Sequence, residues 1–158
     1  MLKMIRDAVL SDDLQYRYRL KRRWAKGDQV TFVMLNPSTA DAHEDDPTLR
    51  RCIGFARDWG YAGLSIVNLY AYRATNPAEL WRTSDPVGPD NDTYLRAAGV
   101  SGDLLVAAWG GNAKSQRVQE VVSLPGFERI NYLRLTQAGQ PSHPLYLPKD
   151  LTPTPWPR

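Results

Sequence analysis

The sequence predicts an α/β fold, a three-layer sandwich around a central, mainly parallel four-stranded sheet with an N-terminal antiparallel edge strand. Apolar runs typical of strands covered on both faces recur along the chain. Segments with helical spacing separate these runs, and this alternation of strand and helix favours parallel pairing with right-handed crossovers. The 158 residues show no second composition regime, so we expect a single domain over residues 1–158.

The first predicted element is the alternating segment at residues 14–24. Apolar side chains alternate there with basic ones, as in a strand with one solvated face. A Lys-Gly-Asp turn leads from it into the apolar strand 30–35, so residues 1–29 are expected to form an edge strand and hairpin. The alternative interpretation is a nucleic-acid patch, in which Arg17, Arg19 and Arg22 contact phosphates.

Caps and helical spacing place the remaining elements. Asp46 and Pro47 supply an acidic cap and a first-turn proline, so a helix is expected from there to Gly60. The proline-rich tail, residues 141–158, is expected to wrap the surface without adding an element. The other predicted elements are strands at 63–70, 104–109 and 130–135 and helices at 76–81, 90–98 and 113–123.

Composition narrows the class of protein. The formal charge of +3 is compatible with a phosphate-bearing ligand but is small for a dedicated polycation. Cys52 is the single cysteine, which excludes an intramolecular disulfide and a cysteine-built metal site. With no membrane-spanning run and no signal-peptide pattern, we expect a cytoplasmic protein with no membrane partner and no cofactor. The sequence carries no signal for an oligomeric state.

Polar residues follow the predicted strands where each one ends. The carboxyl ends of parallel strands meet at one edge of the sheet, where α/β proteins bind ligands. We therefore expect these side chains to surround one cleft. They are Asn36, Ser38, Thr39 and Asp41 after the first strand, Asn68 in the second, Trp109, Gly110, Gly111 and Asn112 after the third, and Thr136, Gln140, Ser142 and His143 after the fourth.

Asn68 is the most unusual of these residues because Val67 and Leu69 flank it within an apolar strand. Burying an unpaired amide costs on the order of 1–3 kcal/mol. One interpretation is that Asn68 bonds the backbone of a neighbouring loop. The other is that its amide reads the edge of a bound base, using donor and acceptor together.

Two further motifs have simple structural interpretations beside functional ones. Asn36 and Pro37 are both favoured turn residues, so this pair could be only a turn. His43 lies in the acidic run 41–46, which could suggest a metal site. That run lacks separated, converging ligands, and the helix cap explains it, so we expect no metal.

The order of these motifs resembles a known family. Residues 36–41, 46–51, 68–77 and 143–147 closely resemble a bacterial and phage family catalogued as a domain of unknown function (number 1643), over nearly the whole chain. More distantly, the layout resembles the uracil-DNA glycosylase superfamily. The resemblance lies in Asn36-Pro37 after the first strand, Asn68 at the end of the second, and His143-Pro144 after the fourth.

The glycosylase resemblance implies roles for these residues. Asn36, with Asp41 or Asp46 near it in the sequence, would position the attacking water, and only a carboxylate could act as a base. Asn68 would pair with the base, and His143 would contact the leaving base. In duplex DNA the target base must leave the stack, and Tyr146 would wedge into the gap. Ser38, Thr39, Trp109 and Asn112 are the further candidates for substrate contacts.

The chain also departs from the superfamily pattern. Met34 stands where a glycine is usual, and Leu145 stands where a serine is usual. The sequence thus predicts a nucleobase-handling hydrolase acting on DNA or on a nucleotide. The alternatives are a non-catalytic nucleotide- or nucleic-acid-binding module, and a protein-interaction domain that uses the arginine-rich hairpin and the proline-rich tail.

Overall fold

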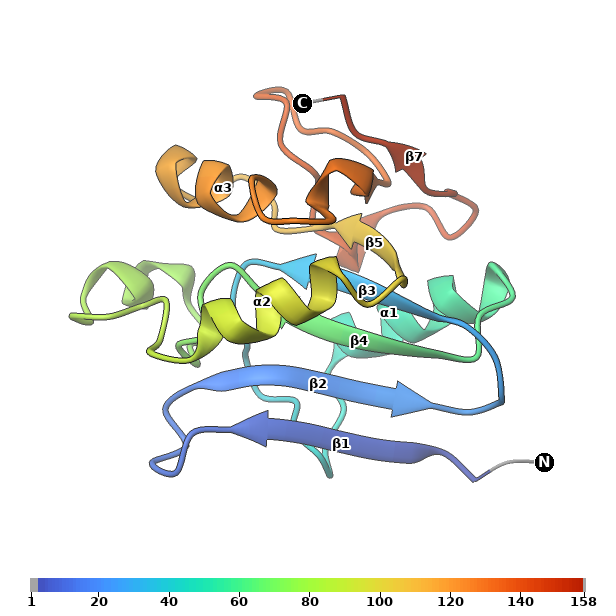
Figure 1. The fold of residues 1–158 in the computed structure, drawn as a ribbon, viewed down its shortest axis with the longest axis horizontal. Coiled ribbons are helices and arrows are strands. Elements are labelled where there is room, and N and C mark those ends of the chain that lie inside the picture. Colours follow the sequence, from blue (N-terminus) through green and yellow to red (C-terminus); the bar gives the residue numbers. More distant parts are fainter. Residues whose placement is uncertain (1–2, 158) are drawn as a thin grey trace.

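One mixed seven-stranded sheet organises residues 3–157, the part of the chain that the computed structural model describes (Figure 1). Its order is β1-β2-β4-β3-β5-β6-β7. Strand β3 pairs parallel with β4 and β5, and β5 pairs parallel with β6, while the other three pairings are antiparallel. The strands are β1 Ile5–Leu10, β2 Arg17–Arg23, β3 Gln29–Met34, β4 Gly63–Asn68, β5 Leu104–Ala107, β6 Asn131–Tyr132 and β7 Thr154–Pro155.

Helices lie on both faces of this sheet. Helix α1 covers one face, and α2 and α3 cover the other (Figure 1). None of the helices within residues 3–157 combines the length and the apolar composition needed to cross a membrane. The α-helices are α1 Pro47–Asp58, α2 Asn91–Gly99 and α3 Ser115–Val122, and the short 3-10 helices are η1 Pro77–Trp81, η2 Phe127–Arg129 and η3 Pro144–Tyr146.

Alternation along the central strands produces two apolar cores. In β3, Phe32 faces α1 and packs with Phe55, while Val33 faces the opposite side and joins the cluster that contains Leu95 of α2. Both faces of β3 and β4 are therefore buried, which explains their nearly unbroken apolar sequences. The expected α/β class is confirmed, whereas the sheet has seven strands with three antiparallel pairings instead of four mainly parallel strands and one edge strand.

The predicted N-terminal antiparallel edge strand exists, but it is β1 and not the segment 14–24. Strand β2 lies inside the sheet, because β1 pairs with its outer side and β4 with its inner side. It also makes no hairpin pairing with β3, which pairs with β4 and β5 instead. The expected solvated basic face is found only in part, since Arg19 and Lys21 are half-buried. Two arginines of this strand are buried instead, with Arg17 4% and Arg22 0% exposed. These arginines are buried because loop carbonyls and a carboxylate accept their hydrogen bonds.

The C-terminal expectations also need correction. The fourth parallel strand is shorter than residues 130–135, since β6 comprises Asn131–Tyr132 alone. The tail adds strand β7 beside it, where Pro155 is tolerated because an edge strand need not donate every N–H. Trp156 fixes the tail by packing edge-to-face on Trp109, with ring centroids 5.5 Å apart.

Helix signals in the sequence are confirmed where caps mark them. Asp46 caps α1, and its Oδ1 accepts a 2.8 Å hydrogen bond from the Leu49 N–H. Asn76 caps η1 through the N–H of Ala78, although the segment forms a 3-10 helix. These caps also have a positional effect, because both begin segments that border the cavity described below.

Cys52 is predicted to be unreactive in the folded protein. The residue is fully buried in α1, and desolvation raises the pKa of its thiol, so almost no thiolate forms at neutral pH. A disulfide-exchange reagent should modify it only after denaturation. Stoichiometric modification under native conditions within minutes would contradict this burial.

Candidate functional site

A cavity of about 390 Å³ opens at the carboxyl ends of β3, β4 and β5. This volume lies within the usual range for small-ligand sites. Two backbone bonds join its walls: the Ala74 N–H donates to Pro37 O, and the Gly110 N–H donates to Pro141 O. The predicted site residues that line it are Asn36, Ser38, Asn68, Trp109, Gly110, Gly111, Asn112 and His143.

Asn68 reaches this cavity from the end of β4 and is 0% exposed to solvent. Neither its Nδ2 nor its Oδ1 has a hydrogen-bond partner within residues 3–157. Its backbone carbonyl is satisfied separately by Nδ2 of Asn91, at 3.0 Å. The interpretation that the Asn68 side chain bonds a loop backbone is therefore wrong. A donor and an acceptor remain unpaired together, at a cost of about 1–3 kcal/mol.

Asn36 lies in the loop that follows β3 and also lines the cavity. Its Nδ2 donates to Pro37 O at 3.0 Å and to Ala74 O at 2.8 Å, which ties this loop to the segment after β4. Both bonds use the amide nitrogen. The Oδ1 therefore remains an acceptor for a water or a ligand group. Asn36 is thus part of the turn and part of the cavity wall together.

His143 borders the cavity at the start of η3, beside the Gly110 turn. Gly110 has a φ of +76°, which a side chain would strain, and a Cβ there would lie 3.7 Å from that of His143. Nδ1 of His143 accepts a 3.3 Å hydrogen bond from the Leu145 N–H. In the neutral ring the proton is then on Nε2, which makes that atom a donor.

His143 should titrate below its ordinary value. Desolvation at the cavity wall lowers its pKa, partly offset by the charge of Asp46. Because the folded state disfavours the imidazolium, stability and the neutral donor are retained above pH 6.5 and lost as the pH falls through the lowered pKa. In an NMR titration, the imidazole signal that disappears in His143→Gln should have a midpoint below 6.5. A midpoint at or above that value would contradict this environment.

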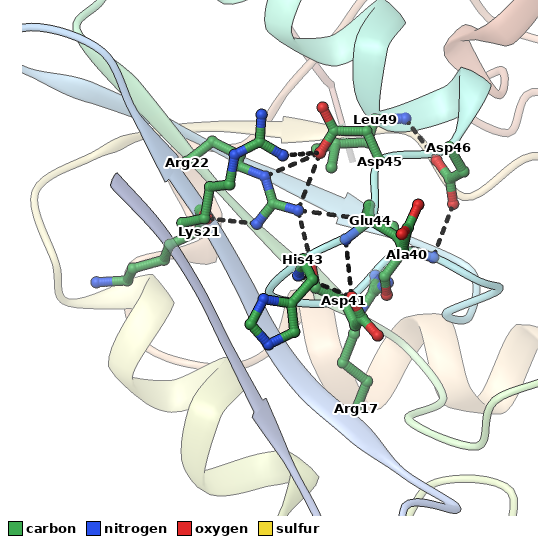
Figure 2. Close-up of polar contacts among 11 residues, drawn as sticks. Arg17, Lys21, Arg22, Ala40, Asp41, His43, Glu44, Asp45, Asp46 and Leu49 are labelled. Atoms are coloured by element: carbon green, nitrogen blue, oxygen red, sulfur yellow. Dashed lines mark hydrogen bonds and ion pairs between the residues drawn. The ribbon is translucent and has the colours of Figure 1, made fainter. Parts of the chain in front are cut away.

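The two candidate carboxylates differ in position (Figure 2). Asp41, expected as a catalytic residue, does not line the cavity. Its Oδ1 accepts hydrogen bonds from the N–H groups of His43 and Glu44, which lowers the pKa of this carboxyl. Asp46 lines the cavity instead, while its oxygens accept bonds from the N–H groups of Leu49 and Ala40.

The residues expected to contact nucleic acid do not form one surface. Arg22 is fully buried, and its guanidinium donates to Asp45 and to loop carbonyls (Figure 2). Arg19 lies over the ring of Tyr94, 5.5 Å from its centroid. Arg17 lines the cavity. Tyr146 is 91% exposed and does not line the cavity.

A comparison with protein-family models matches residues 17–145 to the family described as "Protein of unknown function (DUF1643)". The chain belongs to this family. The matched span begins at Arg17 and ends at Leu145, and the whole cavity lining lies within it. No curated protein and no solved structure matches the chain.

The structure also shows what the sequence patterns misplaced within this DUF1643 domain. Thr39 is exposed and stands outside the cavity lining. Arg17, Thr48 and Thr75 do line it. Thr48 follows the predicted helix cap Asp46 by two residues, so the cap could have indicated that Thr48 lies near the site. Arg17 was predicted only as a phosphate contact on a solvated face, and the alternating pattern around it did not indicate that it would line the cavity. No cluster of three metal-ligating side chains occurs within residues 3–157.

Proposed function

We propose that this cavity binds a nucleobase and that the protein hydrolyses an N-glycosidic bond in a nucleotide or in DNA. The observation that carries the proposal is the Asn68 amide, buried with its donor and its acceptor both unpaired at the cavity. A ligand with an acceptor beside a donor would satisfy both atoms, and the hydrogen-bonding edges of nucleobases have this arrangement.

The resemblance to uracil-DNA glycosylases supports the same function. Asn36, Asn68 and His143 carry its three motifs, and all of them line the one cavity. The strands that they follow belong to the parallel part of the sheet, in the order β4-β3-β5-β6. Since a shared fold does not imply a shared reaction, the chemistry has to be argued from the side chains.

Hydrolysis needs a positioned water and a stabilised leaving base. In the proposed reaction Oδ1 of Asn36 accepts a hydrogen bond from the water, whose oxygen forms a bond to the anomeric carbon. Of the two candidate carboxylates, Asp46 receives the proton of the water, because it lines the cavity and Asp41 does not. The glycosidic C–N bond breaks, and the N–H of His143 Nε2 stabilises the charge that develops on the departing base.

A base-release assay tests this function. The purified protein should liberate a free base from at least one member of a panel of nucleosides, nucleoside monophosphates and DNA strands with normal, deaminated and hypermodified bases. His143→Ala should lower the rate of release by about a hundredfold, by analogy with the loss of one oxyanion donor. Base release that is unchanged in both Asn36→Ala and His143→Ala would place the chemistry elsewhere.

A non-catalytic base-binding module is the second candidate. Both oxygens of Asp46 already accept backbone hydrogen bonds, which opposes a role as proton acceptor. Under this alternative, bases or nucleosides bind with the same dependence on Asn68 while no member of the panel is cleaved.

A further inference from the structure

Arg17 is a buried cation on the wall of the cavity. Its side chain reaches this wall from β2, and the residue is 4% exposed. Burial lowers its pKa to about 10, so the guanidinium keeps its charge at neutral pH. A buried charge is expensive unless it is paired and hydrogen-bonded. The partners of Arg17 therefore decide what this residue does.

Only one nitrogen of the Arg17 guanidinium makes a hydrogen bond within residues 3–157. Its Nη1 donates a 2.7 Å hydrogen bond to Ala40 O, in the loop after β3. Within residues 3–157, Nε has no partner and no carboxylate forms an ion pair with this side chain. The edge formed by Nε and Nη2 is thus unused. Two parallel N–H donors on such an edge match two oxygens of a phosphate or a carboxylate.

The nearby charges are compatible with an incoming anion. Asp46 is the carboxylate with the largest effect on Arg17, but backbone N–H groups hold both of its oxygens. Arg73 and Arg22 add positive charge, and Asp41 adds negative charge. Ser38, Thr48 and Thr75 also line the cavity, so it holds hydroxyl groups as further donors for an anion.

We infer that Arg17 is the anion subsite of the cavity and binds the terminal phosphate of a mononucleotide. This inference rests on the proposed nucleobase site and narrows its substrate to a free nucleotide. A phosphodiester within a nucleic-acid strand is linked to a sugar on both sides, so the strand would have to leave the cavity in two directions, through two exits. A terminal phosphate is joined to the rest of its ligand on one side only, so it needs a single exit and suits a guanidinium that is nearly enclosed.

Matched pairs of ligands test the subsite by calorimetry. The probes are uridine, thymidine, inosine and guanosine, their 5′-monophosphates, inorganic phosphate, and a short thymidine oligonucleotide without terminal phosphates. For at least one base, the monophosphate should bind about tenfold to a hundredfold more tightly than the nucleoside, the expected effect of a charged hydrogen-bonded contact. Arg17→Lys keeps the charge but loses the planar edge, and it should remove most of this ratio.

Arg19→Lys is the matched control. Arg19 lies on the same strand, stacks over Tyr94 and does not line the cavity, so the ratio should be unchanged in this variant. Comparing two ligands on one variant also cancels any difference in the folded fraction between variants.

Each remaining outcome decides against at least one of the two proposals. Equal binding of nucleoside and monophosphate, or a ratio unaffected by Arg17→Lys, overturns the subsite and leaves the nucleobase site standing. An oligonucleotide that binds as tightly as the monophosphate overturns the terminal-phosphate assignment. Arg17-dependent binding of inorganic phosphate without any effect of a base supports the subsite and overturns the nucleobase site. Absence of binding by every probe overturns both.

Discussion

Replacing Asp45 with alanine is expected to lower the free energy of unfolding by about 3 kcal/mol or more, because it leaves a buried charge without its counterion. Arg22 is 0% exposed, and its Nε and Nη2 donate to Asp45 Oδ1 at 3.1 and 3.0 Å. The same guanidinium also binds the carbonyls of Asp41 and Glu44 (Figure 2). This contact therefore fastens the loop between β3 and α1, which carries Asn36 and Asp46.

Chemical denaturation measures this effect, and Arg6 provides its control. Arg6 also contacts Asp45, at 3.3 Å, but its side chain is 41% exposed. Arg6→Ala should change the free energy of unfolding by no more than about 1 kcal/mol, as for other exposed ion pairs. Equal effects of Asp45→Ala and Arg6→Ala would mean that burial of Arg22 does not control the stability of this loop.

Replacing Asn68 with leucine is expected to raise stability and to weaken ligand binding. In the free protein both amide atoms of Asn68 are unpaired, so an apolar side chain of similar size removes a cost of about 1–3 kcal/mol. The same change removes a donor and an acceptor from the cavity. Binding of a nucleobase ligand should then weaken by about tenfold to several hundredfold, depending on how many hydrogen bonds are lost.

Asn91→Leu is the matched control for that substitution. Asn91 is also 0% exposed, but its Nδ2 donates to the carbonyls of Asn68 and Leu69, so its loss should destabilise the fold by about 1–2 kcal/mol. Thermal unfolding of the two variants should therefore shift in opposite directions. A clear loss of stability in Asn68→Leu would mean that the amide has a structural role, and would remove the main support for a ligand site.

The elements that local signals specify could be predicted from the sequence. Asp46 and Pro47 mark the start of α1, and the apolar runs of β3 and β4 follow from their burial on both faces. Strand pairing was harder to predict, because the alternation at residues 14–24 does not show which strands lie on either side of this one. Strand β1 covers the outer side of β2, and Asp45 pairs with Arg22 from a position 23 residues away. Such long-range partners leave no local signal.

The candidate site was predictable to a similar extent. Parallel strand direction brings Asn36, Asn68 and His143 to one cavity, as expected for residues at the carboxyl ends of strands. Asp41 was misplaced, because its short side chain bonds the backbone two and three residues further on, as aspartate commonly does in turns. The position of Arg17 depends on the carbonyl of Ala40, which no sequence pattern indicates.

The most direct test of the nucleobase site is the NMR signal of the Asn68 side-chain amide during titration with the nucleosides and monophosphates named above. We predict that at least one of them shifts both Nδ2 protons of Asn68 in a saturable manner, together with the ring signals of His143. The Asn91 amide, which is bonded to backbone carbonyls, should shift much less. If every ligand leaves the Asn68 amide unchanged, or if the shifts map to residues outside the cavity, this site does not bind nucleobases.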